Sequence, residues 1–287
     1  MKLVTYRAGA QNRLAVVDGD ACIDLHQAQA QVPADLLLAL QQGVDIAAAA
    51  QAAIASTAPR LPLSGLRLAA PVPRPGKIIC LGLNYFDHAK EGERDKPDYP
   101  WFFLRSATSL IAHGEAGIRP RVSVRLDYEA ELAVVIGKRA RHLNQADALG
   151  CVFGYSCFND MSVRDYQKKT PQWTIGKNFD GTGAFGPALV TAEALQPGAT
   201  GLRIQSRLNG QVMQDANTAD MIWGVAETIA LLTECMTLEP GDVIIMGTPA
   251  GVGQARTPPV WMKHGDNVEI EIDNIGTLAN PICDEMA

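Results

Sequence analysis

The sequence predicts an α+β protein that is mostly β, with a small α/β appendage at its N-terminus. Most of the chain consists of short apolar, β-branched runs separated by Gly, Pro, Asn or Asp, which is typical of strands joined by turns. Helical spacing of apolar residues is confined to a few stretches. A proline-rich connector, PVPRPGK over residues 71–77, divides the chain into predicted domains of residues 1–70 and 71–287.

The predicted N-terminal domain begins with two strand-like runs, KLVTYR and RLAVVD. An Ala/Gln-rich region follows, and its apolar positions between Leu36 and Ala53 predict one or two helices. No motif with catalytic chemistry lies in this domain.

The second domain is predicted to be built from seven strand-containing runs: KIICLGL, ELAVVIG, VFGYSCFND, PALVT, LRIQSRLNG, DVIIMGTP and NVEIEIDNIGTL. Its main helix is expected over Ile222–Met236. The sequence has no GxGxxG or Walker motif, so nothing in it supports nucleotide binding.

Composition excludes several classes of protein. The 287 residues are 47% hydrophobic and 20% charged, as in ordinary soluble globular proteins. The net charge of −6 argues against nucleic acid or an anionic membrane as the main partner. We find no signal-peptide pattern and no apolar run of membrane-spanning length, so a cytoplasmic protein is expected. The six cysteines form no CxxC pair, and Cys151 and Cys157 are expected to pack in the core.

Carboxylates alternate just before the strongest strand pattern in the chain. Asp127, Glu129 and Glu131 precede an apolar run, and alternate residues of a strand share one face. Burying three like charges in an apolar neighbourhood would cost several kcal/mol for each charge unless a cation lies among them. A hard divalent ion, Mg²⁺, Mn²⁺ or Ca²⁺, is the preferred candidate. The alternative is an edge strand with a solvated polar face.

A candidate base follows the first strand of the second domain. His88 and Glu91 are three residues apart, so on a helical turn they share a face, and the carboxylate would orient the imidazole and raise its basicity. The alternative is a solvated surface ion pair.

Four further residues could carry chemistry. Asp160 ends a predicted strand and could be another oxygen ligand, with Arg164 one turn later holding a substrate carboxylate, although Asp160 or Ser162 could merely cap a helix. Lys177, in a glycine-rich region, could stabilise or protonate a carbanion, or be an exposed turn lysine. Thr248 and nearby amides in GTPAGVG could bind an anion, unless these glycines serve only tight turning.

The motifs NYxxHxxE, LDYEAEL, FNDMSVRDYQ, GKNFDGTGAFGP and GTPAGVG, in this order, resemble the fumarylacetoacetate hydrolase family. The resemblance runs from about Lys77 to Ile282 and implies a mixed β-sandwich roll that forms homodimers or larger assemblies. The enzyme that names the family has an additional N-terminal SH3-like domain, so this chain is more similar to the smaller bacterial acylpyruvase-type members.

The resemblance also implies roles for single residues. The implied metal ligands are Glu129, Glu131 and Asp160. The implied catalytic residues are His88, Glu91 and Lys177. The implied substrate-binding residues are Tyr85, Arg164, Gln167 and Thr248. Asp127 would have a supporting role, and the stretch 92–120, which includes Tyr99, Trp101, Phe102, Phe103, Arg105 and Ser106, would line the distal end of the substrate or belong to the core.

The implied activity is divalent-metal-dependent hydrolysis of a C–C bond in a 2,4-diketo acid, such as an acylpyruvate or fumarylpyruvate, through a metal-bound enolate. His88 and Glu91 would activate the water. The alternatives are an oxaloacetate decarboxylase or tautomerase, a 2-hydroxy-dienedioate isomerase with the same metal site, and a non-catalytic metal-binding homologue. The expected partner is a small anionic keto acid.

Overall fold

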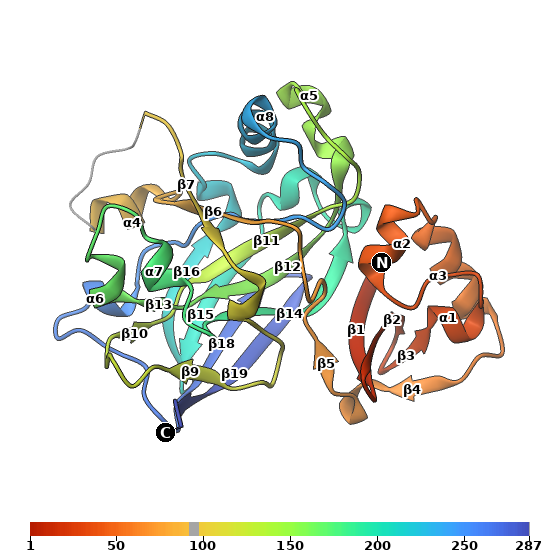
Figure 1. Cartoon of the computed structure of the whole chain (residues 1–287), viewed down its shortest axis with the longest axis horizontal. Coiled ribbons are helices and arrows are strands. Elements are labelled where there is room, and N and C mark those ends of the chain that lie inside the picture. The colour runs from red at the N-terminus through yellow and green to blue at the C-terminus, as the bar shows by residue number, and fades with distance from the viewer. Residues whose placement is uncertain (92–97, 287) are drawn as a thin grey trace.

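The computed structural model describes residues 1–91 and 98–286. It has a 12-stranded mixed sheet and a 5-stranded sheet, with short helices around them (Figure 1), which confirms the predicted α+β, mostly β class. The path of the large sheet is β4-β3-β2-β1-β14-β12-β11-β17-β6-β7, with β5 paired to β1 and β8 paired to β14.

The N-terminal segment supplies one end of the large sheet. Its strands are β1 (Lys2–Ala8), β2 (Gln11–Asp18), β3 (Ala21–Asp24), β4 (Arg60–Pro62) and β5 (Leu68–Ala69). Its helices are α1 (Leu25–Ala28), α2 (Leu36–Gln41) and α3 (Ile46–Ala55), so two helices form in the Ala/Gln-rich region as predicted. Asp35 and Asp45 cap α2 and α3 by accepting hydrogen bonds from backbone N–H groups. Because β1 pairs with β14, this segment continues the sheet that carries the rest of the chain.

The remaining strands of the large sheet are β6 (Ile78–Gly82), β7 (Trp101–Arg105), β8 (Leu110–Ile111), β11 (Ala130–Ile136), β12 (Val152–Asp160), β14 (Gly183–Thr191) and β17 (Val243–Ile245). All seven residues of β11 are buried, because β12 and β17 pair with it on either side and both of its faces are covered. Its start is therefore a water-poor place for a charged side chain.

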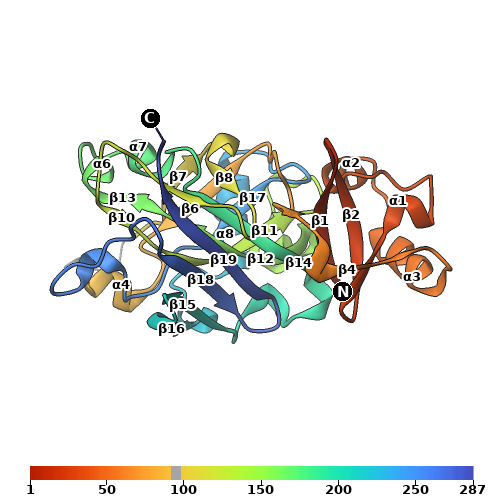
Figure 2. The ribbon, with the colours of Figure 1, turned by 90° about the horizontal axis from the view of Figure 1, so that it is seen from below.

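The second sheet packs across the large one. It has the order β16 (Gln211–Asn217), β15 (Arg203–Leu208), β18 (Asn267–Ile272), β19 (Gly276–Asp284) and β9 (Gly117–Arg119). Val134 and Tyr155 of the large sheet share a core with Ile270 and Leu278 of the second sheet. Figure 2 shows β18 and β19 crossing β11 and β12, which gives the sandwich arrangement.

The body helices are α4 (Phe86–Glu91), α5 (Gln145–Ala148), α6 (Arg164–Gln167), α7 (Thr174–Lys177) and α8 (Val225–Cys235). Helix α8 confirms the predicted helix and begins after its N-cap residue, Gly224. The short strands β10 (Leu126–Asp127) and β13 (Ser162–Val163) pair with each other. Single 3₁₀ turns cover Leu63–Gly65, Ala107–Ser109, Leu149–Cys151, Ala192–Ala194, Pro197–Ala199, Thr218–Asp220 and Gly253–Ala255. Helices α4, α6 and α7 gather at the end of the molecule opposite the N-terminal strands (Figure 1).

Burial agrees with the predicted core thiols, since Cys151 and Cys157 are both buried. Burial also raises the pKa of Cys157 to about 12. Within residues 1–91 and 98–286, no helix has the length and apolar character needed to cross a membrane.

Candidate metal centre and active site

Three carboxylates meet where β11 begins and β12 ends. Strand pairing sets Glu131 opposite Phe158, and the Asp160 N–H donates to the Glu129 carbonyl at 3.0 Å. One oxygen from each of Glu129, Glu131 and Asp160 lies within 4.8 Å of the others, and all three side chains are buried. The structure therefore brings the three predicted ligands together, and a solvated edge strand is excluded for these residues.

Asp127 does not share a strand face with this cluster, so that expectation was wrong. The chain leaves the strand conformation after β10, and β11 starts only at Ala130. The Asp127 carboxylate instead accepts hydrogen bonds from the Gly253 and Gln254 backbone N–H groups at 2.8 and 3.0 Å, and from Arg164 Nε at 2.8 Å. It anchors Arg164, in line with a supporting role.

Basic side chains surround two of the three carboxylates. Lys177 contacts Glu129, and its Nζ lies 2.5 Å from Asp160 Oδ2. Arg164 Nη1 lies 2.7 Å from Glu129 Oε1, and Arg105 Nη1 lies 2.5 Å from Asp160 Oδ1. Lys177 is not an exposed turn lysine, because it ends α7 and is 2% exposed.

These contacts set the charges of the acids. Burial alone would raise the pKa of Glu129, but Arg164 and Lys177 lower it to about 2. Burial is the main cause that raises the pKa of Glu131 well above its usual range, and the negative charges of Asp160 and Glu129 raise it further. Burial opposes the charge of Lys177 as well, yet Asp160 and Glu129 raise its pKa.

Glu131 is the carboxylate that best indicates a site for a cation. It accepts a hydrogen bond from the Gly247 backbone N–H at 2.6 Å, and within the described part of the chain no Lys or Arg forms an ion pair with it. Three buried carboxylate oxygens within reach of one another form the donor set that hard divalent cations prefer. The residues present therefore fit a divalent ion.

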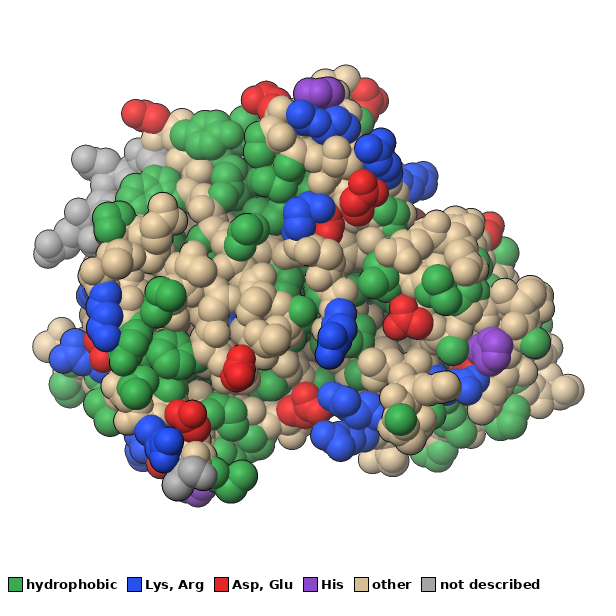
Figure 3. Space-filling model, viewed as in Figure 1, with side chains coloured by type: hydrophobic (Ala, Val, Ile, Leu, Met, Phe, Trp, Pro, Cys, Tyr) green, Lys and Arg blue, Asp and Glu red, His purple; other side chains and the backbone are tan. Residues whose placement is uncertain are grey.

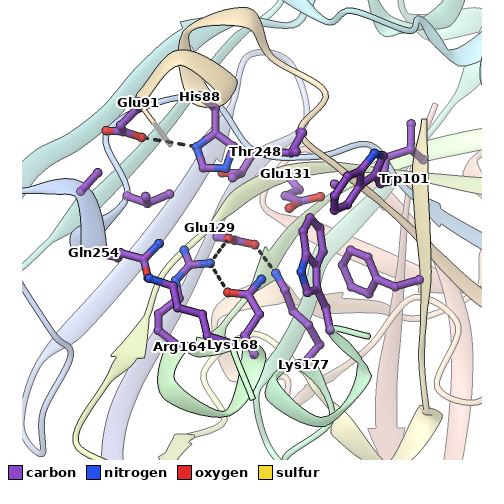
Figure 4. A pocket seen from close by; sticks show the side chains of 18 of the residues that line it. His88, Glu91, Trp101, Glu129, Glu131, Arg164, Lys168, Lys177, Thr248 and Gln254 are labelled. Carbon is purple, nitrogen blue, oxygen red and sulfur yellow. Dashed lines mark hydrogen bonds and ion pairs between the residues drawn. The ribbon is translucent and has the colours of Figure 1, made fainter. Parts of the chain in front are cut away.

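Across the pocket, α4 carries the predicted base. His88 Nδ1 lies 3.3 Å from Glu91 Oε2, and Glu91 Oε1 accepts the Gly251 N–H at 2.9 Å. Both side chains are only partly exposed and line the same pocket as Glu129 and Glu131, as Figure 4 shows. They are therefore part of a pocket wall and not a freely solvated surface pair.

The pocket has a volume of about 760 Å³. Arg164, Gln167 and Thr248 line it, with Gln167 Oε1 accepting from Arg164 Nη1 at 3.0 Å. Arg164 Nη2 is buried and has no hydrogen-bond partner in the described part of the chain. Tyr85 is not among the lining residues, and its buried hydroxyl has no hydrogen-bond partner among residues 1–91 and 98–286, so its contact with a substrate stays a prediction.

The aromatic stretch after α4 is divided between pocket and support. Trp101 and Phe103 line the pocket as expected, whereas Arg105 points to Asp160 and also donates to Thr182 Oγ1 at 2.9 Å. Residues 92–97 lie outside the described residues. Sequence reasoning missed the segment after α6, which adds Lys168, Lys169, Thr170, Pro171 and Trp173 to the lining.

Trp173 shows why no local pattern marks this segment. Its ring lies against Gly82, where a Cβ atom would come within 2.0 Å of Trp173 Cζ3, and its centroid is 5.4 Å from that of Trp101. The contact joins residues about ninety positions apart, and its only sequence signal is a glycine ending a strand.

Fold and site together define a class: enzymes on an open β-sandwich roll with a buried carboxylate centre at one end. The chain belongs to the fumarylacetoacetate hydrolase family, since the family model described as fumarylacetoacetate (FAA) hydrolase C-terminal matches residues 77–283. The family expected from the motifs is confirmed.

Relatives within the family have several activities. The human mitochondrial oxaloacetate tautomerase FAHD2A is 38% identical over 288 residues, covering 98% of this chain and 91% of that protein. The oxaloacetate tautomerase YisK of Bacillus subtilis is 45% identical over 224 residues, covering 77% and 74%. A structure of maleylpyruvate hydrolase from Sphingobium sp. SYK-6, in complex with manganese(II) and pyruvate, matches with a TM-score of 0.83, 31% identity and full coverage of both chains.

Proposed function

We propose that this protein is a divalent-metal-dependent tautomerase that interconverts the keto and enol forms of oxaloacetate. The observation that carries the proposal is a cluster of three buried carboxylates, two of which, Glu129 and Glu131, line one pocket with a histidine–glutamate pair. The names of relatives that are 38% and 45% identical support oxaloacetate as the substrate.

Glu129, Glu131 and Asp160 would hold the ion, which we propose to be Mg²⁺, with Mn²⁺ or Ca²⁺ as the alternatives. When bound, the ion would polarise a substrate carbonyl and stabilise the negative charge of the enolate. Lys177 adds a buried ammonium beside the same carboxylates, and its raised pKa keeps it charged.

His88 would move the proton. Its Nδ1–H donates to Glu91, which leaves the Nε2 lone pair for the substrate. Figure 4 shows the imidazole between Glu91 and the side of the pocket that carries Thr248. Nε2 would take a proton from the carbon next to the keto group and return it to the enolate oxygen, so the reaction consumes nothing.

The pocket suits a dicarboxylate. Arg164 offers its unpartnered Nη2, and Lys168 and Lys169 also line the pocket. This basic lining is local, because acidic and basic side chains are interspersed on the outer face shown in Figure 3 and the chain has a net charge of −6. The pocket would therefore attract an anionic substrate more strongly than the rest of the surface does.

Hydrolysis of a C–C bond in a 2,4-diketo acid is the second candidate. The His88–Glu91 pair suits this reaction as well, because Nε2 could take a proton from a water molecule instead of from carbon. The maleylpyruvate hydrolase structure, 31% identical over the whole chain, supports the same reading.

An assay of the purified protein separates these candidates. We expect Mg²⁺-dependent acceleration of the spectral change between enol and keto oxaloacetate, and none after chelation. Release of pyruvate from an acylpyruvate, without tautomerisation of oxaloacetate, would instead establish the hydrolase. Metal-independent rates with every substrate would contradict both.

We also propose that the protein is a homodimer. Size-exclusion chromatography with light scattering tests this proposal by measuring the mass of the protein in solution.

A further inference from the structure

A buried glutamine outside the proposed reaction connects three parts of the site. Gln214 lies on β16 in the second sheet and is 1% exposed. Its Oε1 accepts the Ala130 N–H at 3.0 Å, and Ala130 lies between two of the three clustered carboxylates in sequence. Its Nε2 donates to Thr248 Oγ1 at 2.7 Å and to the Pro249 carbonyl at 2.8 Å.

The partners fix which way the Gln214 amide points. A backbone N–H can only donate and a carbonyl can only accept, so Oε1 must face Ala130 and Nε2 must face Pro249. A flipped amide would set donor against donor and acceptor against acceptor in a buried site. Thr248 Oγ1 therefore receives a hydrogen bond from an N–H whose direction is settled by two other groups.

This contact determines what Thr248 offers to the pocket. A hydroxyl has one proton and two lone pairs, and Gln214 occupies one lone pair of Thr248. Among the described residues none accepts the Thr248 proton, and the residue lines the pocket. We propose that Gln214 is a positioning residue that makes Thr248 a hydrogen-bond donor to a carboxylate or keto oxygen of the substrate. This inference rests on the proposed function.

The same glutamine lies against the loop that follows β17. Gly247 and Gly251 of this loop donate to Glu131 and Glu91, so the loop contacts both the carboxylate cluster and the base. A Cβ atom on Gly251 would lie 2.3 Å from the Met213 carbonyl, which shows how closely the loop packs on β16. A test must therefore separate the direction of the Thr248 hydroxyl from the position of the loop.

The decisive variant is Gln214→Glu. An ionised carboxylate could still accept the Ala130 N–H, but it would also accept the Thr248 proton and turn the Thr248 lone pairs toward the pocket. Gln214→Met, which has no donor, is a second variant in case burial of the new charge prevents folding. Gln211→Glu makes the same change at an exposed position of β16 and is the matched control.

Calorimetric titration with pyruvate in the presence of Mg²⁺ measures the effect without turnover. We expect Gln214→Glu to weaken pyruvate binding at least tenfold, Gln214→Met to weaken it less, and Gln211→Glu to leave it unchanged. For oxaloacetate, KM should rise by a similar factor, with a smaller change in kcat. In a Thr248→Val background, which lacks the hydroxyl, Gln214→Glu should have no further effect on binding.

Wild-type affinity in both Gln214 variants would overturn the inference. An equal loss with and without the Thr248 hydroxyl would also overturn it, because Gln214 would then act only through the loop. If pyruvate binding follows the expected pattern while oxaloacetate is not tautomerised, the proposed function fails and the inference stands. A wild-type protein that binds no pyruvate with Mg²⁺ contradicts both.

Discussion

The Gly247 backbone N–H donates to the Glu131 carboxylate at 2.6 Å, and this contact joins the loop after β17 to the strand that carries the carboxylate cluster. Glu129 and Asp160 pair with Lys177, whereas Glu131 has no such ion pair within the described residues. The cluster therefore has one acid whose charge is favoured only when a further cation is present.

Replacing this acid should affect the metal more than the fold. Glu131→Gln keeps an acceptor for the Gly247 N–H but removes a crowded carboxylate, so we expect loss of Mg²⁺ binding by calorimetry and an unchanged or higher melting temperature in chelator. Glu129→Gln should instead destabilise the metal-free protein by about 3–5 kcal/mol, because Lys177 and Arg164 lose a buried partner. Normal Mg²⁺ affinity in Glu131→Gln would contradict the proposed centre.

Removing the base should stop turnover without affecting the metal. We expect His88→Ala to lower kcat by about 10²–10⁴-fold while Mg²⁺ affinity stays the same, since His88 faces the carboxylates across the pocket. Glu91→Gln should have a smaller effect because it only orients the ring. His264→Ala, an exposed histidine outside the lining, is the control. Full activity in His88→Ala would refute the role.

Lys177 and a bound metal ion should both stabilise the negative charges of Glu129 and Asp160, so the ion should partly compensate for the loss of Lys177. Lys177→Met leaves two buried carboxylates without their shared partner, so the metal-free protein should lose about 3–5 kcal/mol of unfolding free energy. Added Mg²⁺ should raise the melting temperature of this variant more than that of the wild type. Lys138→Met, at an exposed position, should show no such difference. Equal Mg²⁺ shifts in all three proteins would contradict the prediction.

Low pH should reduce the stability of the protein because Asp24, in the N-terminal segment, becomes protonated. Burial would raise the pKa of this carboxyl, but hydrogen bonds from Arg13 and Tyr6 lower it below 3.8. A lowered folded-state pKa stabilises the protein above the unfolded value of 3.8, and this contribution disappears as pH falls through the folded-state pKa. Asp24→Asn should therefore cost about 1.5–3 kcal/mol at neutral pH, and the difference from wild type should shrink below pH 3.8.

Chemical denaturation at several pH values checks this difference. Asp18→Asn is the control, because the Asp18–Arg60 pair is exposed and should contribute little. A gap between Asp24→Asn and wild type that stays constant with pH would exclude the assigned linkage.

Strand periodicity predicted Glu129 and Glu131 on one face because both lie next to or within a regular strand. It failed for Asp127, since the break before Ala130 turns that carboxylate toward backbone N–H groups that follow it by more than a hundred residues. Local patterns also left Lys177 ambiguous, because its burial depends on partners 17 and 48 residues away. Such pairings are set by sheet order and leave no periodic trace in the sequence.

The same limit explains the residues that were missed or misplaced. Arg105 falls in an aromatic run and was expected beside the substrate, yet the pairing of β7 with β6 directs it to Asp160. Gln214 lies on a polar edge strand with no recognisable motif, and its importance appears only when the second sheet packs on the first. The order of the motifs predicts the family, whereas the hydrogen-bonding partners depend on the three-dimensional packing of the two sheets.

Anomalous diffraction from crystals soaked in MnCl₂ tests the central claim most directly. We predict a single strong peak between the carboxylates of Glu129, Glu131 and Asp160, at coordination distance from an oxygen of each. An ordered pocket with no anomalous density among these three carboxylates would contradict the account.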